Sequence, residues 1–400
     1  MCARVPGGRH ISGRGSSRQV RALHRDERCL FRRSGRAVQI ATLLVCLFGD
    51  LGDTILTVPA VRALRNRYPE SRLVLLAKPE SAAFVARLGL TDSTIEIDKH
   101  AFDRARDLSR PTSLLALAKL SRRVRAERAD TIVLFGHLAS WFGALKYALL
   151  AFATGARRRV GLDNGRGWFL TQAAKDEGFG VRHESEYWLE VVALLDARGP
   201  AVLEAPISDE ERERAGALLE PLLTESGPLV AVHPSTGWYG PGRKWAPERF
   251  ARAIDLLESS HPVRCVALGS DGDRLEIDRM LGAMSKPALD LTGRTSVGEL
   301  AAVLERCDVL IANDGGIGHL AAAVGTPVVS VFGPSNDRAW RPLGSTVVAA
   351  DLPCRPCFYR EFETGLRNGC GTRQCMLLVT PDRVARAAEK LLAGAGSRVV

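Results

Sequence analysis

The sequence lacks a long uninterrupted apolar run. A helix that crosses a membrane needs about 18 or more consecutive apolar residues. The best segment, 37–48, is shorter and is interrupted by Gln39 and Thr42. We therefore predict that the chain does not cross a membrane. Its apolar (46%) and charged (25%) shares are those of a folded globular protein, which excludes a fibre or a wholly disordered chain.

Cysteine is too sparse for a secreted disulfide framework, since there are nine in 400 residues, and a reducing cytoplasm is the expected location. Four of them form a C-x2-C-x12-C-x4-C cluster of Cys354, Cys357, Cys370 and Cys375. Three interpretations stay open: a structural zinc site of four thiolates, a reduced loop that packs its thiols together, and a redox or disulfide role.

Acidic residues are scarce in the first 36 residues, which hold ten arginines against two acids. This Arg-rich extension, 1–37, is expected to be disordered. It is read as a functionless extension or misassigned start, a tether to polyanions or anionic lipid, or a targeting segment. Because the extension carries most of the net charge of +10, the rest of the chain shows no nucleic-acid footprint, and no nucleic-acid partner is expected.

From residue 38 onward, buried apolar strands alternate with amphipathic helices, which predicts an α/β fold of doubly wound parallel sheets. We expect a first Rossmann-like domain over 38–205, a second over 206–380, and a C-terminal helix and tail over 381–400. Such sheets bind ligands at the carboxyl ends of their strands, so the site should lie between the two domains.

The chain has neither the G-x-G-x-x-G spacing of a dinucleotide fold nor the GK[ST] ending of a P-loop, so nicotinamide and Walker-type ATP binding are not indicated. After the first expected strand, 49–53 is predicted to be a turn with a helix beginning at Thr54. Asp53 at this point is either a helix-capping residue or a general base that faces the site.

Three further loops follow expected strands of the second domain. The glycine-rich loop 313–319 exposes amides at a helix start, which is a phosphate-binding geometry. The loop 233–245 brings hydroxyls and cations that suit a diphosphate, or is a solvated basic loop. Asp271-Gly272-Asp273 fits an acid on a ribose hydroxyl or a helix cap better than a metal site, and no metal is predicted.

Together these motifs resemble glycosyltransferase family 9, the ADP-heptose:lipopolysaccharide heptosyltransferases. The resemblance rests on 51–56 with Pro59, on 233–245, on 314–320 and on the cysteine-containing tail, and it covers 38–392. It implies a GT-B fold with two Rossmann-like domains facing a central cleft. It also implies that Asp53 is the catalytic base and that these residues bind the donor: Ser235, Thr236, Lys244, Asp271, Thr295, Asp314, Gly315, Gly316 and His319.

The function implied by the resemblance is inverting, metal-independent transfer of heptose from ADP-heptose to a lipopolysaccharide core acceptor of the lipid A-Kdo type. No cofactor is required. The partners are the nucleotide sugar, the lipid-linked oligosaccharide and the inner membrane surface, which the chain would meet peripherally from the cytoplasm through its basic N-terminus or a helix near Trp141 and Phe142. The alternatives are another nucleotide sugar, a glycan other than lipopolysaccharide, or a non-catalytic nucleotide-sugar-binding protein.

Overall fold

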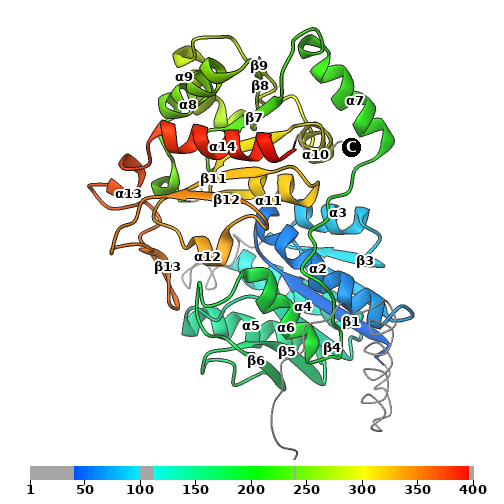
Figure 1. Ribbon diagram of the computed structural model, residues 1–400. Coiled ribbons are helices and arrows are strands. Elements are labelled where there is room, and N and C mark those ends of the chain that lie inside the picture. Colours follow the sequence, from blue (N-terminus) through cyan, green and yellow to red (C-terminus); the bar gives the residue numbers. More distant parts are fainter. Residues whose placement is uncertain (1–39, 99–110, 238–239, 396–400) are drawn as a thin grey trace, which may run out of the picture. The chain divides into compact units, whose positions relative to one another are not determined.

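The structure, a computed structural model, describes residues 40–98, 111–237 and 240–395. The Arg-rich extension predicted over 1–37 lies outside these residues. Two six-stranded sheets, each made only of parallel neighbours, organise the described chain (Figure 1). This confirms the predicted α/β class with two doubly wound sheets. None of the described helices is long and apolar enough to span a bilayer.

The first sheet has the strand order β3-β2-β1-β4-β5-β6. Its strands are β1 (Thr42–Leu47), β2 (Arg72–Ala77), β3 (Ser93–Glu96), β4 (Thr131–Phe135), β5 (Arg158–Asp163) and β6 (Gln172–Lys175). Its helices are α2 (Leu51–Arg67), α3 (Pro79–Arg87), α4 (Pro111–Ala126), α5 (Trp141–Thr154) and α6 (Glu184–Ala193). The central strand β1 is apolar on both faces: Leu43 and Val45 pack in the core of α2 and α6, and Leu44 and Cys46 in the core of α4 and α5.

The second sheet has the order β12-β11-β10-β7-β8-β9. Its strands are β7 (Leu229–His233), β8 (Arg264–Ala267), β9 (Leu289–Asp290), β10 (Val309–Asn313), β11 (Val328–Phe332) and β12 (Thr346–Ala349). The helices are α7 (Asp209–Leu219), α8 (Pro247–Ser260), α9 (Arg274–Ala283), α10 (Val297–Glu305), α11 (Gly316–Ala323), α12 (Asp337–Trp340), α13 (Gln374–Leu377) and α14 (Pro381–Ala395). A small hairpin of β13 (Phe358–Arg360) and β14 (Glu363–Gly365) follows β12.

The C-terminal helix α14 packs on α8 and on β10, β11 and β12, so it belongs with the second sheet. The segment 197–208 between the two sheets contains no helix or strand. The predicted division at 205 and 206 falls inside this segment, and the domain boundaries remain a proposal.

Near the first sheet, one expectation from the sequence is wrong and two elements were not predicted. The turn predicted over 49–53 is shorter, because α2 begins at Leu51 and Asp53 already lies in its first turn. The strand β6 and the helix α6 were not expected. The sequence of β6, Gln-Ala-Ala-Lys, shows no apolar run because this strand lies at the edge of the sheet and is only partly buried.

Candidate functional site

The two sheets each reverse their winding direction at one point, and the predicted site residues follow the strands at those points. In the first sheet the reversal lies between β1 and β4, and in the second between β7 and β10. Loops that leave the carboxyl ends of such strands diverge and leave room for a ligand. Asp53 follows β1, Ser235 follows β7, and Asp314 follows β10.

Asp53 is exposed in the first turn of α2, where its Oδ2 accepts a hydrogen bond of 2.9 Å from the backbone N–H of Asp50. The carboxylate of Asp50 in turn pairs with Lys78. Asp53 therefore caps its helix, as one of the two interpretations of the sequence holds. Capping engages one carboxylate oxygen and leaves the basic role of the group chemically open.

Two glycines fix where this carboxylate lies. A Cβ atom on Gly49 would stand 2.3 Å from the Cβ of Asp53, so only glycine fits beneath the acid. A Cβ atom on Gly52 would stand 3.0 Å from the Cα of Gly316 and 3.2 Å from His319 Cδ2. The first turns of α2 and α11 therefore touch through their glycines, and this contact brings the turn that carries Asp53 to the glycine-rich loop of the second sheet.

A buried ion pair stabilises the predicted donor loop 313–319. Asp314 is 3% exposed, and its Oδ2 lies 3.2 Å from Arg243 Nη1 and accepts a hydrogen bond of 2.6 Å from the Ser335 hydroxyl. Arg243 Nη1 also donates to the backbone carbonyl of Asp314 at 3.2 Å. The carboxylate of Asp314 thus shapes the loop, and the backbone amides of Gly315 and Gly316 at the start of α11 are the groups suited to a phosphate.

His319 lies one turn into α11 and is buried, and its Nδ1 is buried without a hydrogen-bond partner among the described residues. Burial, with the nearby His183 and Arg243, lowers the pKa of His319 to about 3. The ring is therefore neutral near pH 7, and it can offer a ligand a hydrogen bond but no positive charge.

The loop after β7 carries the two predicted hydroxyls, on the buried residues Ser235 and Thr236. Ser235 is 1% exposed and its hydroxyl hydrogen-bonds to the carboxylate of Asp273, while Thr236 is almost as buried. Asp273 also accepts hydrogen bonds from the N–H (2.9 Å) and the hydroxyl (2.7 Å) of Ser270, so this acid completes a capping box at the start of the helical turn 271–273 that leads into α9. Its partner in the sequence motif, Asp271, is exposed and lies against Gly293.

Lys244 does not stand alone in the loop, because its ammonium pairs with the carboxylate of Glu276 on α9. No pattern near Lys244 in the sequence indicates this partner, which lies 32 positions away. A phosphate approaching Lys244 would meet this pair rather than an isolated cation. Thr295, the last predicted donor residue, is half-buried in the turn between β9 and α10, two residues after Gly293.

One charged cluster beside the site was not predicted. His137 follows β4 and is almost fully buried, with Nδ1 3.0 Å from Asp176 Oδ1 and Nε2 3.1 Å from Glu184 Oε2. Burial opposes the charged ring, but the two carboxylates outweigh it and raise the pKa of His137 to about 10. The one feature of the sequence that could have indicated a site role for His137 is its position after β4, a strand next to the point where the winding direction reverses.

This cluster supports a segment that contacts the second sheet's loops. The ring of Phe179 packs on His137, with centroids 4.6 Å apart, and on Trp340, at 5.1 Å. The side-chain amide of Asn336 donates to the carbonyl of Phe179 at 3.1 Å, and His183 Nε2 lies 2.8 Å from the carbonyl oxygen of Arg341. The imidazolium of His137 thus stabilises a bridge between the two halves of the site.

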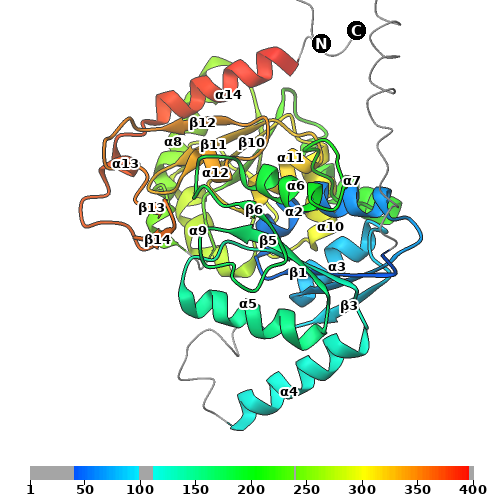
Figure 2. The ribbon, with the colours of Figure 1, turned by 90° about the horizontal axis from the view of Figure 1, so that it is seen from below.

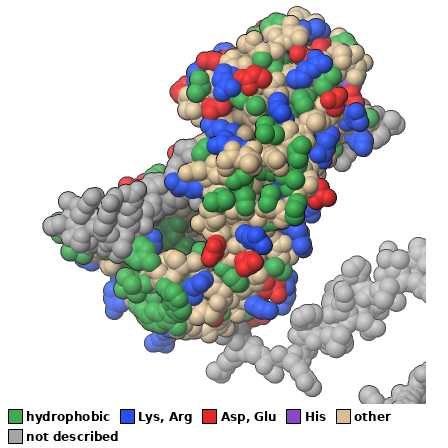
Figure 3. All heavy atoms as spheres, turned by 90° about the vertical axis from the view of Figure 1, so that its left-hand side faces the viewer, with side chains coloured by type: hydrophobic (Ala, Val, Ile, Leu, Met, Phe, Trp, Pro, Cys, Tyr) green, Lys and Arg blue, Asp and Glu red, His purple; other side chains and the backbone are tan. Residues whose placement is uncertain are grey.

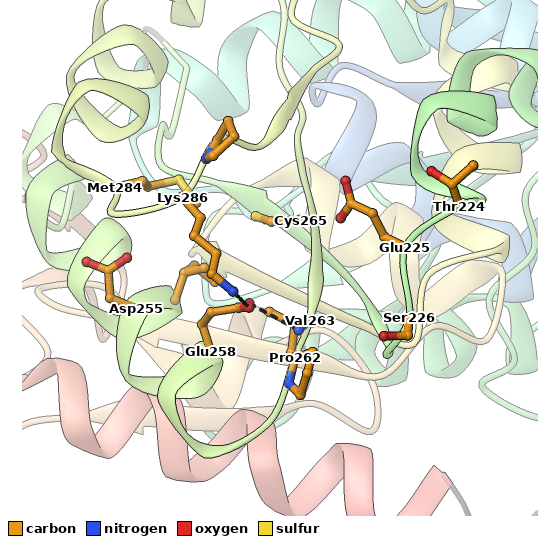
Figure 4. A pocket seen from close by; sticks show the side chains of 12 residues that line it. Thr224, Glu225, Ser226, Asp255, Glu258, Pro262, Val263, Cys265, Met284 and Lys286 are labelled. Atoms are coloured by element: carbon orange, nitrogen blue, oxygen red, sulfur yellow. Dashed lines mark hydrogen bonds and ion pairs between the residues drawn. The ribbon is translucent and has the colours of Figure 1, made fainter.

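A pocket of 490 Å³ lies away from all of these residues (Figure 4). Its walls come from 224–226, from α8 and from 284–287, and Lys286 pairs with Glu258 inside it. Val263, in its wall, directly precedes β8. The pocket is therefore at the amino-terminal edge of the second sheet, opposite the edge where such folds bind ligands, and we do not assign it to the site.

Among the residues that the structure describes, no group of three or more His, Cys, Asp or Glu side chains is arranged to hold a metal ion. In the cysteine cluster, Cys375 is buried, Cys357 is partly buried, and Cys354 and Cys370 are exposed. Burial and the neighbouring thiols of Cys370 and Cys354 raise the pKa of Cys357. The four thiols therefore lie in one region around the β13–β14 hairpin, and the three interpretations of the cluster stay open.

Comparison with known proteins gives a consistent result. The model of glycosyltransferase family 9 (heptosyltransferase) matches residues 117–365. Lipopolysaccharide heptosyltransferase 3 of Escherichia coli is 25% identical over 373 residues, which are 85% of this chain and 96% of that protein.

Two solved structures share the fold. The glycosyltransferase family 9 protein from Veillonella parvula superposes with a TM-score of 0.68 at 22% identity, over 90% of this chain and 100% of the other. The E. coli ADP-heptose lipopolysaccharide heptosyltransferase II superposes with a TM-score of 0.66 at 19% identity, over 89% and 99%. The predicted GT-B fold is thereby confirmed.

Proposed function

The chain belongs to glycosyltransferase family 9 and is a glycosyltransferase, and within this class we propose that it transfers heptose from ADP-heptose to a lipid-linked acceptor of the lipopolysaccharide core. The observation that carries the proposal is the contact of Gly52 with Gly316, which puts the turn of Asp53 against the glycine-rich loop of the second sheet. The names of the relatives, which are heptosyltransferases, supply the sugar and the acceptor class.

In the proposed reaction, Asp53 removes the proton from an acceptor hydroxyl as the oxygen attacks the anomeric carbon of the heptose. The bond between this carbon and the diphosphate breaks, ADP leaves with the bonding electrons, and the configuration at the carbon inverts. The exposed position of Asp53 supports this role, because an acceptor must reach its carboxylate from solvent. The capping hydrogen bond from Asp50 holds the carboxylate in one orientation.

The donor would be bound by the second sheet's loops. The amides at the start of α11 and the hydroxyls of Ser235 and Thr236 face the diphosphate in this proposal, and Lys244 contributes a cation. Because Lys244 is paired with Glu276, the donor phosphate replaces this carboxylate as the partner of the ammonium. Asp271 and Thr295 would flank the nucleoside, and the neutral ring of His319 would hydrogen-bond to the sugar or phosphate.

Stabilisation of the departing diphosphate by amides and cations needs no bound metal, and no cofactor is part of the proposal. We further propose that 38–205 binds the acceptor, that 206–380 binds the donor, and that the enzyme works from the cytoplasm as a peripheral protein of the inner membrane, where a lipid-linked acceptor would be found.

The substitution Asp53→Asn tests the role of the base separately from the helix cap. Asparagine keeps a side-chain oxygen that can accept from Asp50 N–H, so the free energy of unfolding should change by less than about 0.5 kcal/mol. It cannot take a proton, so turnover should fall by about 10³-fold or more. Affinity for ADP-heptose, measured by calorimetry, should stay within about twofold because the donor loops are on the other sheet.

The variant Asp53→Ala is the matched control, because it removes both the base and the cap. It should lose turnover to the same extent as Asp53→Asn and also lose about 1 kcal/mol of stability. Turnover by Asp53→Asn near the wild-type rate would exclude Asp53 as the base and leave it as a capping residue.

A further inference from the structure

Helix α5 shows an inverted pattern of side-chain size. It buries the small residues Ala144, Ala148 and Ala151 against the first sheet. Its large apolar side chains point outward instead, and a tryptophan from the loop after β5 extends this surface. We call these residues the α5 face; each is between 47% and 64% exposed, and they are Trp141, Leu145, Leu149, Phe152 and Trp168.

The α5 face is continuous. Its helical members follow one another at spacings of four, four and three residues, so they form one stripe along the helix. The rings of Phe152 and Trp168 lie 6.0 Å apart, which joins the loop to the stripe. Figure 3 shows the result as a broad apolar area at the lower left of that view. A contiguous apolar area of this kind marks an interaction site.

Cations surround the α5 face. The ammonium of Lys146 lies 5.0 Å from the ring of Phe142, and the guanidinium groups of Arg159 and Arg166 lie 5.0 Å and 6.0 Å from Phe152 and Trp141. The two arginines donate to the backbone carbonyls of Phe169 and Leu138. Neither forms an ion pair within the described part of the chain.

Carboxylates are missing from the same region of the sequence. The stretch 131–162, which contains all of α5, has no Asp or Glu, and neither has α4. Helix α4 lies beside α5 (Figure 2) and adds the exposed Leu114 and Leu115 with Lys119 and Arg122. Among the described residues, Lys146, Arg159 and Arg166 lie against the rings of this region, and α4 and α5 contain no acid. Apolar side chains next to cations match an anionic lipid surface, in which acyl chains lie next to phosphates.

The helix that carries the face packs, through its buried side, next to the proposed catalytic turn. Helix α5 begins just beyond the carboxyl end of β4, the strand paired with β1. The ring of Tyr147 on α5 lies 5.7 Å from that of Phe48, which directly precedes Gly49. The Trp141 end of the α5 face therefore lies at the same edge of the sheet as Asp53, and the Phe152 end lies towards the opposite edge, where β5 begins.

We propose that the α5 face docks the protein on a bilayer that contains anionic lipid. Its aromatic and leucine side chains enter the boundary between headgroups and acyl chains, and Lys146, Arg159 and Arg166 meet lipid phosphates. The proposal adds a membrane-docking surface to the proposed function. It rests on that function only for the reason why the enzyme would bind a membrane. A second copy of the chain fits the face less well, because a two-fold contact through α5 would bring the same cations together.

The test uses the full chain and vesicles of phosphatidylcholine with and without phosphatidylglycerol. The double variant Leu145→Gln/Leu149→Gln alters the face, and Leu223→Gln/Leu275→Gln changes two leucines elsewhere that are at least as exposed. In cosedimentation with the anionic vesicles the face variant should bind about tenfold or more weakly than wild type, while the control binds like wild type. Hydrogen exchange of 141–168 should slow when wild type binds vesicles, which separates the face from the Arg-rich N-terminus.

Equal vesicle binding by the face variant and its control would overturn the proposal. So would a face variant that loses self-association in light scattering but keeps its affinity for vesicles, because the face would then join two copies of the chain. Both variants should transfer sugar to a delipidated acceptor at the wild-type rate. Vesicle binding through the face by a wild-type protein that transfers no heptose would support the docking surface and refute the proposed function.

Discussion

The substitution Gly49→Ala changes one methyl group directly beneath the proposed base. The new Cβ would stand 2.3 Å from the Cβ of Asp53, whereas carbon atoms in contact lie about 3.5 Å or more apart. The Cβ of Asp53 is fixed to its helix and cannot rotate away. The carboxylate must therefore shift by about 1 Å, and such a displacement of a reacting group costs about 10²-fold in rate.

Initial rates at saturating donor should show this loss in kcat, and the affinity for ADP-heptose should be unchanged. Because the shift also weakens the capping hydrogen bond at Asp50, urea unfolding should show a loss of about 1 kcal/mol. Gly282→Ala is the matched control: this glycine lies in α9 with no neighbouring atom within 4 Å, and alanine there should leave the rate unaltered. A Gly49→Ala enzyme within about twofold of the wild-type kcat would refute the idea that the position of Asp53 controls turnover.

Three further outcomes are expected. Lys244→Ala should weaken ADP-heptose binding by about tenfold or more in calorimetry, whereas Lys286→Ala, which breaks an ion pair at the opposite edge of the sheet, should not; equal affinities would exclude a phosphate role for Lys244. His137→Gln should cost about 3 kcal/mol of folding free energy at pH 6. Because the pKa of His137 is raised from 6.5 to about 10 in the folded protein, this cost should shrink as the pH rises above 6.5 and reach its minimum by about 10. A cost that does not vary with pH would contradict the charged ring. The pKa of His319 is shifted in the opposite direction, down to about 3, so its ring resonances should not titrate between pH 5 and 9. The buried neutral ring should lower the free energy of unfolding as the pH falls below 6.5, because the unfolded chain then binds a proton that the folded protein does not.

The sequence predicted what depends on local patterns. Uniformly apolar strands such as β1 and β4 and the glycine-rich turns after them indicated two parallel sheets, and the topology brought the turns of Asp53 and Asp314 to the expected strand ends. The sequence alone allowed two interpretations of Asp53, a helix-capping residue and a general base. The hydrogen bond from Asp50 establishes the capping role, and the basic role awaits its experiment.

What the sequence could not predict depends on partners far apart in the chain. Glu276 pairs with Lys244 across 32 positions, and Glu184 reaches His137 across 47. Nothing near either residue in the sequence signals such a partner. The contact of Gly52 with Gly316 is of the same kind, since it depends on how two separate sheets pack. Conversely, Asp314 has a clear motif, but its carboxylate is engaged by Arg243 and Ser335 inside the protein.

The most direct test of the proposed function is a transfer reaction with the purified full chain, ADP-heptose and a lipopolysaccharide acceptor that lacks core heptose, analysed by mass spectrometry. We expect an acceptor heavier by one heptose, formation of ADP in equal amount, and a rate about 10³-fold or more lower with the Asp53→Asn enzyme. UDP- and GDP-linked sugars should give no product. Transfer from one of those donors would keep the fold and the base but replace the sugar donor. Equal rates of product formation by wild type and Asp53→Asn would exclude Asp53 as the base.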